Sequence, residues 1–364
     1  MAKKTRISIL YNQPVSGIEE HERLAITESG TLANRTPAQQ KGKLSMQQLI
    51  DLSETGVVEE MDDIKEALNS TGYKTTVMNV DSNVYRLIDY LKTEKPDLVF
   101  NLVESVENQA IHEMHVAGLY ELMKVPYTGA GPLALGLALN KPRVKELLGF
   151  HGIRTPGSKV YRAGDKIGTP ILPFPLIVKP SCEDASVGIE DKSVVETVAE
   201  LRRRVQFIVE EYEQPALVEE FIDGRELNVA ILGSRHPMVL PISEIDFSGL
   251  TDTMRKIVTY EAKWMHGTIA YEGTKGVCPA QLPAKVEAEV KATALRCFHV
   301  IGCRDYARID FRLSKSGIPY VLEVNPNPDI SADAGFARSA RTQGFTYPEA
   351  IGKIVESALD RIRA

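Results

Sequence analysis

RIDFRLSKSGIPYVLEVNP, residues 308–326, is the stretch that decides the fold of this chain. Two alternating runs flank a Ser-Gly turn signal, which predicts a β-hairpin because side chains along a strand point to opposite faces in turn. With Ser-Gly as a two-residue turn, Asp310 lies opposite Glu323. The same register sets Arg308 opposite Asn325, so all four polar side chains share one face.

The other face of the hairpin is apolar and suits packing against a core: Ile309, Phe311, Leu313, Leu322 and Val324. Two carboxylates directly opposed on one face repel each other, so we expect a positive charge between Asp310 and Glu323. Together with Asn325 they form an oxygen-only set, which suits Mg²⁺ better than Zn²⁺. The alternative is a solvated polar face on which Arg308 and Arg312 neutralise the two acids.

The composition is that of an ordinary globular protein of 364 residues, long enough for two or three domains. A net charge of −6 argues against nucleic acid as the main partner. No apolar run is long enough to span a bilayer, and the first residues lack the apolar segment of a signal peptide. The four cysteines have no metal or redox spacing, so we expect reduced thiols and a cytoplasmic protein with no membrane partner.

Strands and helices alternate in the first third of the chain. Strands are expected at residues 6–11, 74–80 and 97–103, and helices from Val57 to a stop at Gly72 and at 84–91. This order predicts a parallel sheet with crossover helices, a Rossmann-like α/β domain at residues 1–128 without a Gly-rich phosphate fingerprint. The polar stretch 12–43 has no periodicity and is interpreted as a long loop or a partly disordered insertion.

Two α+β units follow, at residues 129–222 and 223–364. In the first, Asn140 is expected to cap a helix that runs to Gly149, and a second helix is expected at 194–212. Strands are predicted at 159–161, 174–179 and 216–222, then at 226–232 and 238–245, and helices at 283–300 and 347–362. Residues 247–276 lack the periodicity of a packed element, which predicts a mobile lid.

Several motifs in the second and third units occur in one characteristic order: VPYTGAGPLALGLALNKPRVKELL, IVKP, Ser-Val-Gly, LVEEFIDGREL, YEAKW and the hairpin. This order resembles the ATP-grasp superfamily, and within it the D-alanine:D-alanine ligases. The resemblance covers residues from about 97 to 364. It implies a two-lobed ATP-grasp fold after the Rossmann-like domain, and thus a chain of mixed α/β and α+β class.

Carried over by position, the resemblance implies a site for ATP and two Mg²⁺ ions, or Mn²⁺ in their place, with Asp310, Glu323 and Asn325 as the metal ligands. Arg308 would neutralise the tetrahedral intermediate and Lys263 would meet the γ-phosphate. The remaining ATP contacts implied are Lys141, Lys179, Ser186 and Val187 at the phosphates, Glu219, Glu220 and Ile222 at the adenine, and Glu226 at the ribose. Read singly, Lys141 is also explained as a surface residue at a helix start, and Glu226 as the surface partner of Arg225.

This chain departs from the ligase pattern at three places. The phosphate loop has Asp184 and Ala185 where those ligases have Gly and Ser. The Gly-Gly pair after the first strand is absent, so Glu20 in Glu-His-Glu is only a partial match to the residue that anchors the first amino acid's ammonium. Beyond the hairpin, Asp329 takes the place of a Gly, and residues 334–335 replace a Ser-Leu pair that holds the acceptor carboxylate.

The function expected is a carboxylate-amine ligase that forms an amide or peptide bond through an acyl-phosphate and acts on amino acids or peptides, with a homodimer as the candidate assembly. A ligase for another acid and amine, and a nucleotide-binding regulator without catalysis, are the alternatives. The changes at residues 329 and 334–335 predict an acceptor other than simple D-alanine, with Arg338 or Arg341 as the replacement anchor for its acid group.

Overall fold

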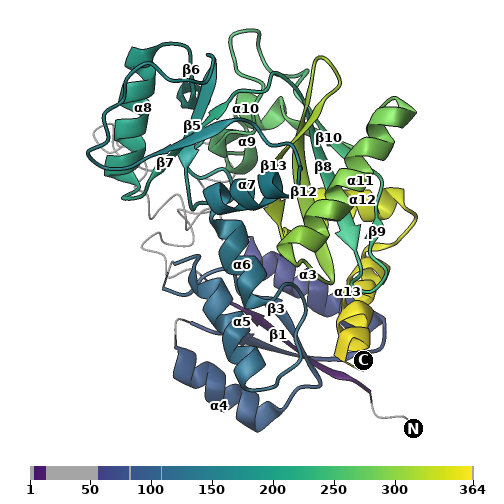
Figure 1. Cartoon of the computed structure of the whole chain (residues 1–364). Coiled ribbons are helices and arrows are strands. Elements are labelled where there is room, and N and C mark those ends of the chain that lie inside the picture. Colours follow the sequence, from purple (N-terminus) through teal and green to yellow (C-terminus); the bar gives the residue numbers. More distant parts are fainter. Residues whose placement is uncertain (1–3, 14–55, 82, 108, 363–364) are drawn as a thin grey trace.

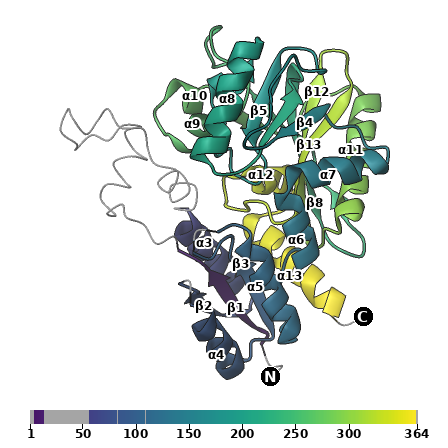
Figure 2. The same cartoon turned by 60° about the vertical axis from the view of Figure 1, so that its left-hand side comes forward.

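The computed structural model describes residues 4–13, 56–81, 83–107 and 109–362, which form three sheets and the helices that cover them (Figures 1 and 2). Glu20 and most of the 12–43 stretch lie outside these residues. In the described part of the chain, no helix is long and apolar enough to cross a membrane.

The first sheet is parallel, with the strand order β2-β1-β3, as the alternation of strands and helices predicts. Helix α3 begins at Val57 and buries the predicted apolar face, and Gly72 follows it with a positive φ of 94°. The elements of this part are β1 (Arg6–Tyr11), α3 (Val57–Ser70), β2 (Lys74–Asn79), α4 (Val84–Glu94), β3 (Leu98–Leu102) and α5 (His112–Leu122).

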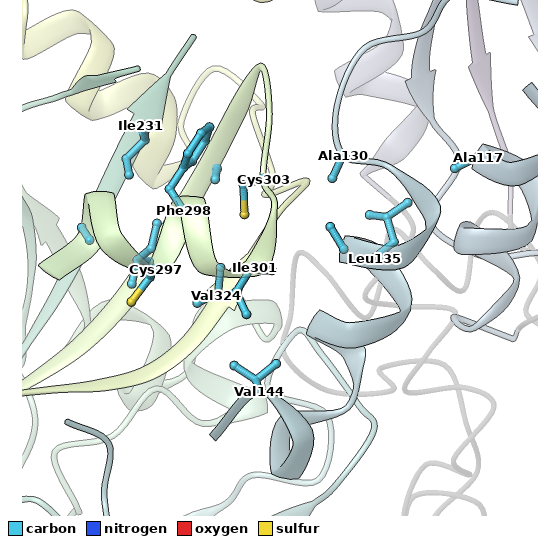
Figure 3. Close-up of a cluster of buried hydrophobic side chains, with 14 of the residues drawn as sticks. Ala117, Ala130, Leu135, Val144, Ile231, Cys297, Phe298, Ile301, Cys303 and Val324 are labelled. Atoms are coloured by element: carbon cyan, nitrogen blue, oxygen red, sulfur yellow. The ribbon is translucent and has the colours of Figure 1, made fainter. Parts of the chain in front are cut away.

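Helices α6 (Pro132–Leu139) and α7 (Lys141–Phe150) connect this sheet with the rest of the molecule. The side chain of Asn140 accepts a hydrogen bond from the backbone N–H of Arg143, which confirms the predicted cap of α7. Leu135 and Val144 share a core with Phe298 and Ile301, as Figure 3 shows. The two helices therefore pack against the C-terminal sheet, and α7 is held where its first residues reach the hairpin.

The four-stranded sheet has the order β4-β7-β5-β6 and is covered on one face by α8. Its elements are β4 (Ser158–Tyr161), β5 (Leu176–Pro180), β6 (Val194–Val195), α8 (Val198–Glu211) and β7 (Ala216–Glu220). The helix predicted from Val194 is wrong at its start. Thr197 and Glu200 form a capping box, which begins α8 at Val198 and leaves the two valines before it as an edge strand.

The largest sheet contains the hairpin and has the order β11-β10-β8-β12-β13, with β9 paired to β8. The strands are β8 (Gly224–Leu232), β9 (Met238–Val239), β10 (Ser243–Asp246), β11 (Lys275–Val277), β12 (Tyr306–Ser314) and β13 (Pro319–Asn325). The prediction of a single strand at residues 238–245 is thus wrong. Pro241 lies between β9 and β10, and it has no backbone N–H to donate to a neighbouring strand.

Five helices complete this part: α9 (Tyr260–Trp264), α10 (Ile269–Glu272), α11 (Ala284–Ile301), α12 (Gly335–Thr342) and α13 (Tyr347–Ile362). Side chains of β8 and β12 alternate between two cores. Val229 and Ile309 pack with α11, whereas Ala230 and Tyr306 pack with α12 and α13. The polar side chains of β12 therefore point to the side of α12, away from α11.

The predicted register of the hairpin holds at its functional end, where Asp310 pairs with Glu323 and Arg308 with Asn325. The two-residue turn is wrong: Ser314 accepts from Gly317 and donates to the carbonyl of Ile318, so the tip is shifted by one residue. A β-bulge absorbs the shift. Asp310 pairs with Glu323 while the next residue, Phe311, pairs with Val321, so β13 has one extra residue between these two pairs. Leu322 is accordingly only half-buried, and Val321 takes its place in the core.

Candidate functional site

Arg308 and Asp310 occupy the same face of β12, two residues apart, and form a bidentate ion pair. The guanidinium Nε and Nη2 atoms lie 2.8 Å from Oδ1 and Oδ2 of Asp310. Asn228 of β8 donates to the same carboxylate at 2.8 Å, and Asn325 does so at 3.1 Å. The positive charge expected between the two acids is thus partly supplied by Arg308, as in the alternative interpretation of the hairpin.

Arg312 has another role. Its guanidinium contacts Glu226 at 3.4 Å and donates to the carbonyl of Gly224 at 2.9 Å. Burial raises the pKa of Glu226, and Arg312 opposes that rise. The alternative interpretation of Glu226 as the surface partner of Arg225 is wrong. Arg225 forms a bidentate pair with Glu244 instead, with its Nε and Nη2 atoms 2.6 and 2.5 Å from the two carboxylate oxygens.

Glu323 faces the lysine at the start of α7. Lys141 is buried, and its Nζ lies 3.9 Å from Oε2 of Glu323 and 2.8 Å from Asp184 of the phosphate loop. It also donates to the carbonyl of Glu183. Burial disfavours the charge of Glu323. The positive charges of Lys141, Lys179 and Arg308 outweigh this effect and lower the pKa of Glu323 to about 2. The reading of Lys141 as a surface residue is therefore wrong.

A second cluster of charges lies at the four-stranded sheet. Glu219 is buried, and its two carboxylate oxygens lie 2.7 Å from Nζ of Lys145 and 2.7 Å from Nζ of Lys179. Despite burial, the two lysines lower the pKa of Glu219 to about 2. Lys145 was not predicted as a site residue, although its spacing of four from Lys141 puts both lysines on one face of α7.

The other two residues predicted to contact the adenine, Glu220 and Ile222, lie at and just beyond the end of β7. Glu220 accepts from the backbone N–H of Gly157 at 2.8 Å, which ties the end of β7 to the segment before β4. Ile222 is half-buried in the link from β7 to β8. Glu220 directly follows Glu219 and Ile222 lies two residues further on, so the predicted adenine residues occupy one short stretch of chain that begins at the lysine cluster.

The phosphate loop turns sharply at Ala185 and Ser186, which have positive φ angles of 54° and 62°. Its carbonyl at Ala185 accepts a hydrogen bond from the indole of Trp264 at 2.9 Å, and Ile189 accepts from the backbone of Tyr260 at 2.9 Å. Val187 is buried. The loop is therefore held against α9, the helix that carries Lys263.

Lys263 is the predicted γ-phosphate ligand, and it lies on the large-sheet side of the site. Burial and the nearby charge of Arg308 lower its pKa, whereas Asp329, Glu104 and Glu323 act against that change. Its Nζ lies 4.7 Å from the centre of the Trp264 ring. The residues predicted from the two lobes thus converge on one site between α7, the phosphate loop, α9 and the hairpin.

Acidic side chains that were not predicted lie on the side of the first sheet. Burial raises the pKa of Glu60 well above its ordinary value, as do the neighbouring charges of Asp329 and Glu104. Glu60 accepts from the backbone of Ile330, and Asp329 accepts from Ser331 at 2.9 and 2.6 Å. No local pattern marks Glu60 or Glu104, because only the tertiary fold brings α3 and the end of β3 to residues 329–330.

The donor set of the hairpin fits a hard cation. Asn325 directs Nδ2 toward Asp310 at 3.1 Å and toward Glu323 at 3.5 Å, so the three side chains converge and the amide oxygen of Asn325 is turned away from both acids. The carboxylate oxygens of Asp310 and Glu323 are ligands that Mg²⁺ prefers, and Asn325 would add its amide oxygen only after the amide group turns over. Within the described residues no group of three or more His, Cys, Asp or Glu side chains could hold a metal ion, and the hairpin itself offers two carboxylates beside the amide of Asn325.

Comparisons with known proteins give the family to which the chain is similar. Residues 164–356 match the family model described as D-ala D-ala ligase C-terminus. The chain is 35% identical to the uncharacterized protein y4sG of Sinorhizobium fredii, over 82% of this chain and 86% of that one. It is 31% identical to the D-alanine--D-alanine ligase of Desulforudis audaxviator, over 81% and 91% of the two chains.

Among solved structures, the D-alanine--D-alanine ligase of Bacillus anthracis complexed with ATP superposes with a TM-score of 0.70. The match covers 99% of this chain and 98% of that one, at 22% sequence identity. The likeness of fold therefore extends through all three sheets, including the first, where the sequence resemblance is loose.

Proposed function

This chain belongs to the D-alanine–D-alanine ligase family of ATP-dependent C–N ligases, and we propose that it joins a small carboxylate to an amine with Mg²⁺ as its metal. The observation that carries this proposal is the convergence at one site of the hairpin acids with lysines from both lobes. Lys141 and Lys179 lower the pKa of Glu323 from the small-lobe side, and Lys263 lies on the other.

The proposed reaction has two steps. A carboxylate oxygen of the first substrate attacks the γ-phosphorus of ATP, the bond to the β,γ-bridging oxygen breaks, and ADP leaves. The amine nitrogen of the second substrate then attacks the acyl carbon, loses a proton, and expels inorganic phosphate. Both steps develop negative charge on oxygen, so positioned cations contribute more than covalent help from the protein.

Roles follow from position. Lys141 and Lys179, with Ser186 and the backbone of Val187, would hold the phosphates of ATP, and Lys263 would hold the γ-phosphate. Arg308 would neutralise the tetrahedral intermediate, since its guanidinium is fixed by Asp310 on the face that lies toward the site. The remaining ATP contacts proposed are Glu219, Glu220 and Ile222 at the adenine and Glu226 at the ribose.

We propose that two Mg²⁺ ions bind at this site, where Asp310, Glu323 and Asn325 would hold them. When bound, Mg²⁺ neutralises phosphate charge. Arg308 now engages both oxygens of Asp310, so this carboxylate must be shared with the guanidinium or released by it as metal binds. The protein's own part is to orient Asp310 through Asn228, whose side chain donates to the carboxylate at 2.8 Å.

Further features of the organisation are proposed on the same basis. The three sheets suggest domains at residues 1–128, 129–222 and 223–364, the first of them Rossmann-like, with α6 and α7 packed against the C-terminal sheet. The substrates would be amino acids or peptides. ATP as a substrate and four free cysteines favour a cytoplasmic location. A homodimer is the assembly we propose to test.

A nucleotide-binding regulator is the second candidate. Such a regulator would need the lysines and the residues proposed to contact the adenine. It would not need a guanidinium placed where negative charge develops during attack on the acyl carbon. The presence of Arg308 beside Asp310, at 2.8 Å, therefore favours an enzyme over a sensor.

The test is a screen of amino-acid pairs for ATP-dependent release of phosphate, with mass spectrometry of the products. We expect phosphate and an amide product in equal amounts with at least one pair. Tight ATP binding without turnover for any pair would support the regulator. Phosphate release without an amide product would indicate a hydrolase and overturn the proposal.

A further inference from the structure

Arg338 of α12 places its guanidinium beside the catalytic face of the hairpin. A Cβ built on Gly335 would lie 3.4 Å from Nη2 of Arg338 and 4.0 Å from Cδ of Arg308, so the two arginines border the same small space. Across from α12, a Cβ built on Gly276 of β11 would lie 2.0 Å from the central carbon of the Arg338 guanidinium. Only a glycine at 276 leaves room for the guanidinium in this position.

The guanidinium of Arg338 forms no ion pair in the described residues, although the charge of Asp333 acts on it from a distance. In the part of the chain described, its side chain makes one hydrogen bond, from Nε to the hydroxyl of Ser243 at 3.0 Å, and neither Nη group has a partner there. Burial, with Arg341 and Arg308 nearby, lowers the pKa of Arg338. A half-buried guanidinium beside other cations is unfavourable on its own, so this arrangement is suited to an anion that arrives with the substrate.

The other arginine of α12 is placed differently. Arg341 is exposed and donates to the backbone carbonyl of Ala332. The sequence leaves both arginines open as the replacement anchor, and the structure distinguishes them: Arg338 lies beside Arg308 and Arg341 lies at the surface.

We propose that Arg338 binds the carboxylate of the acceptor, so that the acceptor is an amine with a free acid group, such as an amino acid or a short peptide. This inference rests on the proposed ligase function. The carboxylate of the first substrate is converted into the acyl-phosphate, and the phosphates of ATP face the lysines of the small lobe. The acceptor's acid group is the anion that remains to be bound, and the planar guanidinium fork holds a carboxylate through two parallel hydrogen bonds.

Arg338 therefore acts on specificity and not on the transfer of phosphate. Removing the guanidinium should weaken the binding of acceptors that carry a free acid, because their carboxylate would then enter the site without a charged partner. Acceptors in which the acid is blocked as a carboxamide should be little affected. Activation of the first substrate should not change.

The experiment compares Arg338→Met and Arg338→Lys with the matched control Arg341→Met on the same helix. Hydroxylamine traps the acyl-phosphate as a hydroxamate without using the acceptor site, so it reports folding and the first half-reaction. A panel of D- and L-amino acids, each offered as free acid and as carboxamide, reports the acceptor site. We expect Arg338→Met to lower kcat/KM for free-acid acceptors by roughly 100-fold, mostly through KM, with wild-type hydroxamate formation.

The ratio of kcat/KM between acid and carboxamide should fall to near 1 in Arg338→Met, stay unchanged in Arg341→Met, and be intermediate in Arg338→Lys, which keeps the charge but not the fork. Equal losses for acids and carboxamides, or a rise in the KM for ATP that accounts for the loss, would overturn the inference while leaving the ligase function standing. Absence of both hydroxamate and amide product in the wild-type enzyme would overturn the proposed function, and the inference with it.

Discussion

Lys141 lies between the carboxylates of Asp184 and Glu323, with its Nζ 2.8 Å from the first and 3.9 Å from the second. Asp184 belongs to the phosphate loop and Glu323 to the hairpin, so this one ammonium bridges the two sides of the proposed ATP site. Burial disfavours its charge, but the two acids raise the pKa of Lys141 above its ordinary value. The ammonium is therefore held in its charged form at the place where phosphate oxygens are proposed to bind.

Replacing Glu323 by Gln is expected to abolish ligation. The substitution removes a charge that is proposed to bind the metal while keeping the shape of the side chain. It should also lower stability at neutral pH, since a carboxyl with a pKa of about 2 in the folded state stabilises that state above the pKa of the unfolded chain, and this contribution disappears as pH falls through both values. About 3 kcal/mol is an upper bound. Phosphate-release assays and urea denaturation measure both effects, and near wild-type turnover would rule out the metal assignment.

Replacing Arg308 by Ala is expected to lower kcat far more than it weakens ATP binding. A donor that stabilises developing charge contributes roughly 2.7–4 kcal/mol to the transition state. Steady-state kinetics together with calorimetric titration of ATP separate the two effects, and Arg308→Lys serves as a control that keeps the charge. If the Kd for ATP rose in proportion to the lost activity, Arg308 would be a phosphate ligand instead.

Much of this site is visible in the sequence because strand alternation and motif order are local signals. The pairing of Asp310 with Glu323 holds. The bulge at the hairpin could not be predicted, since Val321 and Leu322 are both apolar and either one satisfies the core. Lys145 carried a signal that was overlooked, its spacing of four from Lys141 on α7.

The acidic side of the site had no such signal. Glu60 and Glu104 lie far from the motifs and reach Asp329 only through the packing of the first sheet against the hairpin's extension. The lid was predicted without regular structure, yet it contains α9 and α10. Both helices are short, at five and four residues, and capped by Thr259 and Thr268, so their periodicity is too brief to detect.

The lid is expected to gain protection from hydrogen exchange when ATP binds, together with the phosphate loop. Trp264 donates to the carbonyl of Ala185 at 2.9 Å, so the two segments should become ordered as a unit. Exchange measured with and without a non-hydrolysable ATP analogue tests this over residues 181–189 and 247–276. In Trp264→Phe, which lacks the donor, the gain should be smaller in both segments. Identical protection with and without the analogue would contradict the prediction.

Replacing Glu113 by Gln is expected to stabilise the protein near neutral pH. Burial raises the pKa of Glu113 well above its ordinary value, although Asn327 donates to it at 2.8 Å. Between the unfolded pKa of about 4.3 and the raised folded value, the folded state binds more protons, so the carboxyl's contribution to stability is lost as pH rises through this window.

Gln keeps the acceptor for Asn327 without a titrating group. Urea denaturation from about pH 4 to pH 8 should show a variant that is more stable than the wild type by about 1–2 kcal/mol at the upper end, with the difference vanishing at the lower end. A difference that does not change with pH would mean that Glu113 does not titrate in this range.

Simple D-alanine is expected to be a poor acceptor for this enzyme. Ala334 has no hydroxyl to bind a carboxylate, and Arg338, the group proposed to bind the acceptor's acid, is one helical turn further along the chain. Asp329 adds negative charge close to the reacting centre, where Glu60 and Glu104 already lie, so an acceptor with an additional ammonium would fit this side better than a methyl group. Competition between D-alanine and the best acceptor of the amino-acid screen, read by mass spectrometry, measures the preference. Formation of D-alanyl-D-alanine at a rate equal to that of any other pair would show that neither change alters the acceptor site.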